Sequence, residues 1–224
     1  MIQPQIAIDG ERSRIYDHIA RHVLERGWCA IADVLPPELC QSLFLEAAVQ
    51  ARGEDFRPAG VGRQDEHRIN RFVRRDQIQW LEGTTPAQQQ WLGWMDGLRL
   101  HLNRQLFLGL FGFESHFARY PVGAFYRKHV DAFRGDANRV LSTVLYLNPD
   151  WSTEDGGTLV LYDGDDGSGE QRELGRFLPV FNSLVVFLSE EFPHEVLPTR
   201  RERYSIAGWF RINPSSEQRV DPAR

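Results

Sequence analysis

The hydrophobic positions of this chain change their spacing near residue 113. Before that point they recur every three or four residues, which predicts helices at residues 13–26, 37–52 and 86–105. Gly27 suits the end of the first helix, and Pro37 and Pro86 suit the first turns of the other two. The side chains expected to be buried on the first two helices are Ile15, Ile19, Val23, Leu24, Leu39, Leu43, Leu45 and Ala48.

After residue 113 the pattern consists of short apolar runs separated by Gly and Asp turns. The strand candidates are residues 116–122, 124–132, 138–148, 156–163, 171–178, 183–189, 194–199 and 203–212. Short strands in this number and spacing are typical of a jelly roll, also called a double-stranded β-helix. We therefore expect a mainly β fold with flanking helices, built as one domain over residues 1–224. Its jelly-roll core should span about 114–213, covered by an N-terminal helical and strand support at about 13–113.

Two further strands are expected at residues 28–35 and 72–81. The stretch at residues 53–72 is polar, rich in Gly, Arg and Asp, and has no hydrophobic period. Such a stretch is uncommon within a compact protein unless it binds something, so we interpret it as a substrate-facing loop. Trp91 and Trp94 lie at helical spacing, and we expect both to pack in the core.

Composition and charge narrow the classes of partner. The chain has 224 residues, is 42% hydrophobic and carries a net charge of -5, which gives no electrostatic reason to expect a nucleic-acid partner. We find neither a secretory signal pattern nor an apolar run approaching about 18 residues, so we expect a cytoplasmic protein with no membrane partner. A monomer is the default expectation. Cys29 and Cys40 are too few and too far apart for a disulfide framework or a thiolate zinc site, so both should be reduced and packed.

The clearest candidate chemistry lies in His129-Val130-Asp131. In an extended strand alternate side chains point to the same face, so this imidazole and this carboxylate can converge on one ion. His194 lies on a later predicted strand and would supply a second imidazole. Two imidazoles and one carboxylate on one side of a metal leave positions open for oxygen and a cosubstrate, as in non-haem Fe(II) oxygenases.

Arg203 follows nine residues after His194. Its guanidinium fork suits a carboxylate, such as the distal carboxylate of 2-oxoglutarate. Together these residues predict a site for Fe(II) and 2-oxoglutarate. The alternative from another class is a metal-free jelly-roll binding module, in which His129 and His194 only hydrogen-bond a ligand. A zinc hydrolase would favour more nitrogen donors or a nearby general base.

Longer stretches carry a family resemblance. They read GWCAIADVLPPELC, RRDQIQWLEG, YPVGAFYRKHVD, RVLSTVLYLNPDW, GGTLVLYD and FPHEVLPTRRERYSIAGWF. In this order and spacing, over roughly residues 25 to 212, they resemble the Fe(II)- and 2-oxoglutarate-dependent prolyl 4-hydroxylases related to the animal oxygen-sensing enzymes, bacterial members included. The iron motif is shared with a wider superfamily, whereas LYLNPDW and RDQIQWLEG are specific to this narrower group.

The resemblance implies a role for each matching residue. The iron ligands would be His129, Asp131 and His194, and Arg203 would be the catalytic partner of the cosubstrate's distal carboxylate. Tyr146 would help to hold that carboxylate, and Tyr120 would lie near the iron-proximal end of the cosubstrate. The residues implied in binding the prolyl substrate are Arg139 and Trp209, together with Arg74 and Asp76, which lie where the family has a mobile loop.

The resemblance also implies the reaction. The enzyme would be a dioxygenase that uses Fe(II), 2-oxoglutarate and O2 to hydroxylate a prolyl residue of a protein, releasing succinate and CO2, with ascorbate as reductant. Elongation factor Tu is such a substrate in bacterial relatives and is the leading expectation here. The nearest alternative is a 2-oxoglutarate oxygenase acting on another protein residue, a small molecule or nucleic acid. The acidic balance and the lack of a basic, aromatic-interleaved groove argue against nucleic acid.

Overall fold

The computed structural model describes residues 4–53, 56–59, 72–132, 138–164 and 171–213. Its elements in chain order are α1 (Pro4–Arg26), β1 (Trp28–Ile31), α2 (Pro37–Gln50), β2 (Arg57–Pro58), β3 (Gln77–Trp80), α3 (Pro86–Leu106), β4 (Gly112–Tyr120), β5 (Tyr126–His129), β6 (Arg139–Tyr146), the 3-10 turn η2 (Thr153–Asp155), β7 (Leu159–Tyr162), β8 (Glu173–Phe177), β9 (Leu184–Leu188), β10 (His194–Val196) and β11 (Arg203–Arg211). The helices are those expected, with boundaries that differ most at α1.

The strands form two antiparallel sheets. The larger has seven strands in the order β1-β9-β6-β11-β4-β3-β2, and the smaller has four in the order β5-β10-β7-β8. The eight strands from β4 to β11 are distributed over both sheets, which confirms the expected jelly roll with flanking helices. The N-terminal strands β1, β2 and β3 extend the larger sheet at its two edges, so the N-terminal part does more than cover the core.

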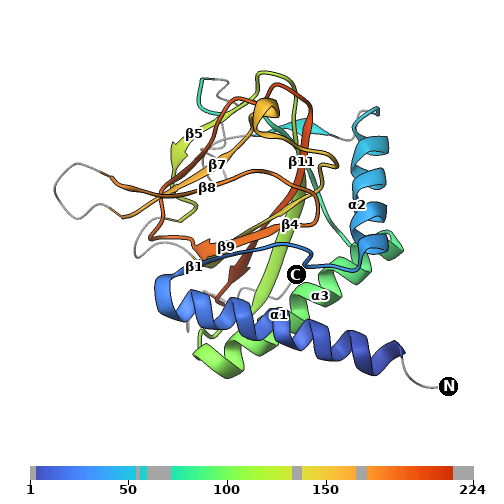
Figure 1. Ribbon diagram of the computed structural model, residues 1–224, viewed down its shortest axis with the longest axis vertical. Helices are drawn as coiled ribbons and strands as arrows, with labels where there is room; N and C mark the ends of the chain where they lie inside the picture. Colours follow the sequence, from blue (N-terminus) through green and yellow to red (C-terminus); the bar gives the residue numbers. More distant parts are fainter. Residues whose placement is uncertain (1–3, 54–55, 60–71, 133–137, 165–170, 214–224) are drawn as a thin grey trace, which may run out of the picture.

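Two apolar layers lie on the two faces of the larger sheet. On the outer face, α1 and α3 run along one side of the sheet and α2 stands beside it (Figure 1). There Leu145, Ile206 and Phe210 are fully buried in one cluster with Leu98 of α3. On the inner face, Tyr146 and Phe187 of the larger sheet pack with Leu161 and Val196 of the smaller one. The candidate site lies in this inner layer.

The helix predictions need two corrections. Helix α1 begins at Pro4 rather than near residue 13. A proline is tolerated in this first turn because its missing N–H would have no intrahelical partner there. Leu24 and Leu45 are 72% and 52% exposed, although both were expected in the core. Leu24 directly follows the buried Val23 and therefore points about 100° away from it around the helix. Trp91 and Trp94 are buried, as predicted.

Several strands are shorter than predicted. Strand β1 ends at Ile31 because Asp33 has a φ of 52° and because the next residues bond to Asn182 instead of a strand. Only Gln77–Trp80 of the predicted strand at 72–81 is regular. Strands β5, β7 and β10 are also shorter than expected, whereas β4 begins earlier, at Gly112.

The predicted loop at residues 53–72 is only partly described, since residues 54–55 and 60–71 lie outside the described ranges. Within it, Arg57 and Pro58 form the short strand β2 against β3, where no strand was expected.

Both cysteines are free and buried, as expected. Burial raises the pKa of the Cys29 thiol to about 11 and the pKa of the Cys40 thiol to about 12, so both are protonated near neutral pH. Among the described helices, none combines the length and the apolar character that a membrane span requires.

Candidate metal and cosubstrate site

His129, Asp131 and His194 come together between β5 and β10. These strands pair so that His129 and His194 stand opposite each other. Asp131 Oδ1 lies 3.5 Å from His129 Nε2, and Oδ2 lies 3.7 Å from His194 Nε2. Donors that bind one ion at about 2.1 Å can be at most about 4.2 Å apart, so each of these pairs can share an ion. Strand β5 ends at His129, so the backbone beyond the strand, rather than the predicted strand alternation, returns Asp131 to the site.

The backbone sets which nitrogen of each imidazole faces the site. His129 Nδ1 lies 2.8 Å from the Arg127 carbonyl oxygen, and His194 Nδ1 lies 3.1 Å from the Phe192 carbonyl oxygen. A carbonyl only accepts a hydrogen bond, so each Nδ1 carries the proton and each Nε2 presents a lone pair. This is the usual arrangement of imidazole ligands to metals.

A serine pair holds the carboxylate of Asp131. Ser142 Oγ donates to Asp131 Oδ2 at 2.6 Å, and it lies 2.9 Å from the hydroxyl of the buried Ser189. Sequence reasoning missed both serines. Strand alternation could have found Ser142, because it lies four residues before Tyr146 on the same strand and therefore on the same face.

The charge states suit a divalent cation. Burial alone would raise the pKa of Asp131, but His194, His129 and the Ser142 hydroxyl outweigh it and hold this pKa well below its usual value. Burial and the nearby His129 lower the pKa of His194 to about 4. Near neutral pH the site therefore offers a carboxylate and a neutral imidazole, the forms that bind metal.

Arg203 is the first residue of β11 and is only 1% exposed. Its Nε donates to the Gly157 carbonyl at 3.0 Å, and its Nη1 donates to Ser205 Oγ at 3.2 Å. Its Cζ lies 4.7 Å from the centre of the Tyr120 ring and 5.1 Å from that of Tyr146. Within the described part of the chain, no carboxylate pairs with it. A buried charge without a counter-charge is costly, so this guanidinium points to an anionic ligand.

Tyr146 and Gly157 support the same conclusion. Tyr146 Oη is buried and, among the described residues, has no hydrogen-bond partner. Burial raises the pKa of this phenol to about 12, so it remains a donor near neutral pH. A Cβ on Gly157 would lie 2.9 Å from Arg203 Cδ, so the absence of a side chain there makes room for the arginine. The cluster of Arg203, Tyr146 and Tyr120 fits the carboxylate of a cosubstrate such as 2-oxoglutarate.

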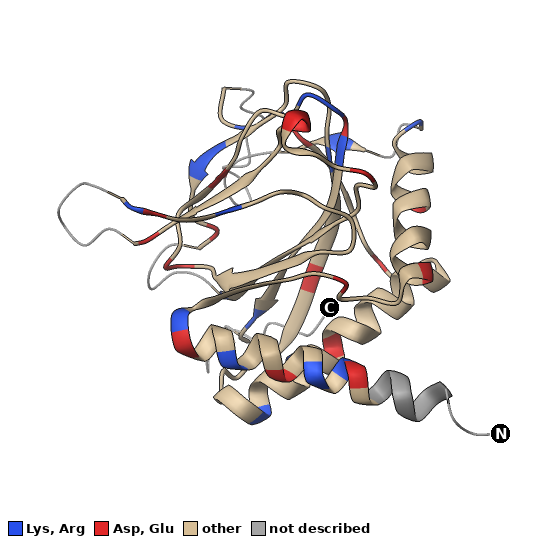
Figure 2. Ribbon diagram, in the orientation of Figure 1, with Lys and Arg blue, Asp and Glu red and all other residues tan. Residues whose placement is uncertain are grey.

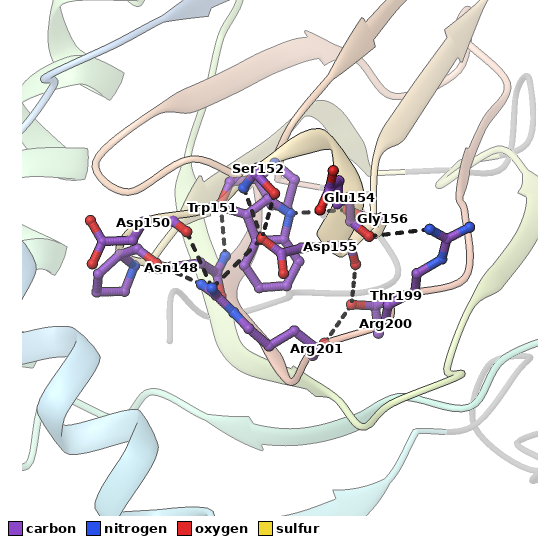
Figure 3. Close-up of polar contacts among 12 residues, drawn as sticks. Asn148, Asp150, Trp151, Ser152, Glu154, Asp155, Gly156, Thr199, Arg200 and Arg201 are labelled. Atoms are coloured by element: carbon purple, nitrogen blue, oxygen red, sulfur yellow. Dashed lines mark hydrogen bonds and ion pairs between the residues drawn. The ribbon is translucent and has the colours of Figure 1, made fainter.

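A polar network braces the loop that carries Gly157. Figure 3 shows Arg201 laid against Trp151, with Asp155 and Thr199 beside it. Arg201 Nη2 donates to the Pro149 carbonyl at 2.6 Å, and the Arg201 Cζ lies 4.5 Å from the centre of the Trp151 ring. The amide of Gly157 donates to the Pro198 carbonyl at 3.1 Å. These contacts fix the carbonyl that orients Arg203.

Trp209 and Arg139 lie together at the other end of the inner face. The Arg139 Cζ stands 3.8 Å above the Trp209 ring, and its Nη2 donates to Glu114 at 2.8 Å. In register, Trp209 stands beside Ser142, the serine that holds Asp131. Trp209 Nε1 is buried and without a partner among the described residues. Trp209 and Arg203 thus lie toward opposite ends of β11, and Trp209 adjoins the candidate metal ligand Asp131 through Ser142.

Arg74 and Asp76 form an ion pair with 2.5 Å between Nη2 and Oδ2. The Arg74 Cζ lies 4.3 Å from the centre of the ring of Tyr126, the first residue of β5, which also carries His129. The structure thus places all ten predicted site residues on or beside the inner layer, Arg203, Tyr146 and Tyr120 at one end and Arg139 and Trp209 at the other.

Sequence reasoning missed His116, an aromatic neighbour of Trp209, and Trp80, which packs against His116. The His116 ring centre lies 5.4 Å from that of Trp209 and 5.2 Å from that of Trp80. Burial and the nearby Arg74 lower the pKa of His116 to about 4, so its ring is neutral. Trp80 is 47% exposed at the rim. The signal available in the sequence was the position of Trp80 directly after the RRDQIQ stretch.

Known proteins resemble this chain in sequence and in fold. Residues 115–211 match the model of the 2OG-Fe(II) oxygenase superfamily. The chain is 29% identical to human Egl nine homolog 1 over 205 residues, which is 87% of this chain but 46% of that protein. It thus spans about half the length of the Egl nine relatives it matches.

Two solved structures are similar over most of the chain. A Pseudomonas putida prolyl-4-hydroxylase superposes with a TM-score of 0.77 at 42% identity, covering 88% of this chain and 99% of that one. A prolyl hydroxylase from Trichoplax adhaerens, solved with a peptide fragment of the hypoxia inducible factor oxygen degradation domain, gives 0.76 at 25% identity, covering 90% and 91%. The family implies Fe(II), 2-oxoglutarate and O2, and the ligand set and the Arg203 cluster fit them. This chain belongs to the 2OG-Fe(II) oxygenase superfamily and, within it, to the prolyl 4-hydroxylases related to the animal oxygen-sensing enzymes.

Proposed function

We propose that this chain hydroxylates a prolyl residue of a protein substrate, consuming 2-oxoglutarate and O2 and releasing succinate and CO2. The observation that carries the proposal is the buried guanidinium of Arg203, which has no carboxylate partner in the described ranges and shares the inner layer with a complete set of iron ligands. A metal-free binding module has no need for both features.

Each residue of the metal and cosubstrate site has a proposed task. His129 and His194 would hold Fe(II) through Nε2, and Asp131 would hold it through a carboxylate oxygen. Arg203 and Tyr146 bind the distal carboxylate of 2-oxoglutarate, and Tyr120 packs beside it. Bound iron and 2-oxoglutarate supply the oxidising chemistry, while the protein supplies orientation and excludes water. The two sheets achieve that exclusion by burying Tyr146, Leu161 and Phe187 around the cosubstrate cluster.

The substrate is proposed to bind at the end that carries Trp209. The exposed ring of Trp80 offers aromatic surface to a prolyl ring, and it adjoins Trp209 through the ring of His116. The Arg139 Cζ lies 3.8 Å from the centre of the Trp209 ring. Arg74 and Asp76 would contact the peptide from the β3 side. Elongation factor Tu is the candidate substrate, ascorbate the reductant that keeps the iron ferrous, and a monomer in the cytoplasm the working form.

The test is mass spectrometry of elongation factor Tu and of total cell protein after incubation with the chain, Fe(II), ascorbate and 2-oxoglutarate in air. We expect a one-oxygen gain on a proline, absent with the Asp131→Ala variant. Succinate release without oxygen gain on any proline would move the proposal to another substrate. No succinate at all would refute the oxygenase activity.

A further inference from the structure

A second cluster of metal-ligating side chains lies far from the iron ligands in sequence, between α1 and β1. It consists of His18 and His22 of α1 and Cys29 of β1. One potential ligand atom of each residue lies within 4.8 Å of those of the other two, and the same holds for His129, Asp131 and His194. Both histidines are partly exposed and the thiol is buried, so an ion would enter from the helix side.

The local structure prepares these groups as ligands. His18 and His22 are four residues apart, so both project from one face of the helix, with ring centres 4.1 Å apart. His22 Nδ1 lies 2.8 Å from the His18 carbonyl oxygen, so this nitrogen donates and Nε2 presents its lone pair. The neighbouring Trp28 packs against Phe177 in the inner layer, so strand alternation turns Cys29 to the opposite face, toward α1.

The donor types select the class of ion. Two imidazoles and one thiolate suit zinc, which commonly binds three protein ligands and leaves the fourth tetrahedral position to water. The thiol must lose its proton to the solvent as the ion binds, and coordinated thiols do so. The positive charges of Arg21 and Arg26 act on His18 and would oppose the binding of a cation. The Arg26 guanidinium, however, is held by Trp28: its Cζ lies 3.8 Å from the centre of the Trp28 ring and its Nε donates to the Trp28 carbonyl. Acidic residues lie among the basic ones along α1 (Figure 2).

We propose that His18, His22 and Cys29 form a zinc site separate from the iron site. The ion would join α1 to β1, the edge strand of the larger sheet. Strand β1 pairs with β9, and Phe187 of β9 packs against the iron-ligand ring of His194 with ring centres 4.7 Å apart. The zinc site would thus stabilise the edge of the sheet that supports one side of the iron site.

The test is an anaerobic titration of the full chain with Co²⁺ under reducing conditions, followed by displacement with Zn²⁺. Cobalt bound to a thiolate gives a sulfur-to-metal charge-transfer band in the near ultraviolet. The iron ligands contain no sulfur, so cobalt bound there does not contribute to this band. We expect the band to saturate at one equivalent, to persist in the Asp131→Ala variant and to disappear when Zn²⁺ is added.

Matched variants decide the assignment. Cys29→Ala should abolish the band, whereas Cys40→Ala, which removes an equally buried thiol on α2, should leave it unchanged. His18→Gln and His22→Gln change partly exposed side chains, so the fold should persist while cobalt affinity falls at least tenfold. The proposal is overturned if the unmodified chain shows no band, if the band survives Cys29→Ala, or if both glutamine variants bind cobalt as tightly as the parent.

Discussion

The two ends of the inner face of the larger sheet use arginine in opposite ways. At the covered end, Arg203 is 1% exposed and, among the described residues, its hydrogen bonds go to neutral oxygens. At the open end, around Trp209, Arg139 and Arg211 share Glu114. An arginine already paired with a carboxylate needs no further anion. An unpaired and buried arginine does, and this difference separates the proposed cosubstrate site from the proposed substrate surface.

Arg203 and Arg139 both lie against aromatic rings, yet we expect them to have different functions. The Arg203 Cζ lies 4.7 Å from the Tyr120 ring centre and 5.1 Å from that of Tyr146. The Arg139 Cζ lies 3.8 Å from the Trp209 ring centre. All three distances are below the limit of about 6 Å for a cation–π contact. The charge partner and the degree of burial distinguish the two arginines. Substitutions that remove or exchange these charge partners therefore test whether the two arginines differ in function.

The largest effect is expected at the metal ligands, between the two ends. Asp131→Ala removes the only carboxylate of the triad, so succinate production should become undetectable, while the thermal unfolding transition shows that the protein still folds. The measurement is succinate released under saturating Fe(II) and 2-oxoglutarate. Turnover comparable to that of the parent chain would refute the ligand set.

At the covered end, Arg203→Ala should weaken 2-oxoglutarate binding by more than about 100-fold. The guanidinium fork can make two charge-assisted hydrogen bonds to a carboxylate, each worth about 1.5 to 3 kcal/mol. Titration of the Fe(II)-loaded protein with 2-oxoglutarate measures the effect. The matched control is Arg139→Ala at the open end, which should leave 2-oxoglutarate affinity unchanged; equal losses in both variants would end the distinction between the two arginines.

Ser142→Ala should lower iron affinity by about 10- to 100-fold, the usual cost of removing a group that orients a metal ligand. Ser142 donates directly to Asp131, whereas Ser189 contacts only Ser142 among these residues. Ser189→Ala should therefore cost less. Competition for Fe(II) with a chelator of known affinity would measure both losses, and a larger effect at Ser189 would contradict the proposed order of contacts.

The smallest effect is expected at the open end. Glu114→Gln removes the charge shared by Arg139 and Arg211, whose side chains are about one quarter exposed. Partly exposed ion pairs contribute up to about 1 kcal/mol, so the KM for a peptide substrate should change by up to about fivefold and the KM for 2-oxoglutarate should not change. A change in the 2-oxoglutarate KM instead would show that the two ends are not independent.

The sequence predicted the helices, the strands of the jelly roll and the candidate iron ligands from hydrophobic spacing and residue type. Hydrophobic spacing reports which face of an element is buried, and the pairing of imidazole with carboxylate reports metal chemistry wherever the chain folds. The errors arose where tertiary contacts override local pattern. Strand β1 stops early because its continuation bonds to Asn182, and Asp131 reaches the site from beyond the end of its strand.

The residue identities alone predicted two imidazoles and one carboxylate suited to iron and an arginine suited to 2-oxoglutarate. The tertiary structure was needed to see that Arg203 lacks a charge partner among the described residues and that Ser142 donates to Asp131. It was also needed to see that Trp80, His116 and Trp209 form one aromatic row. The physical reason is that these properties belong to pairs of residues on different strands. The register of the sheets brings those pairs together, and no local stretch of sequence contains both members.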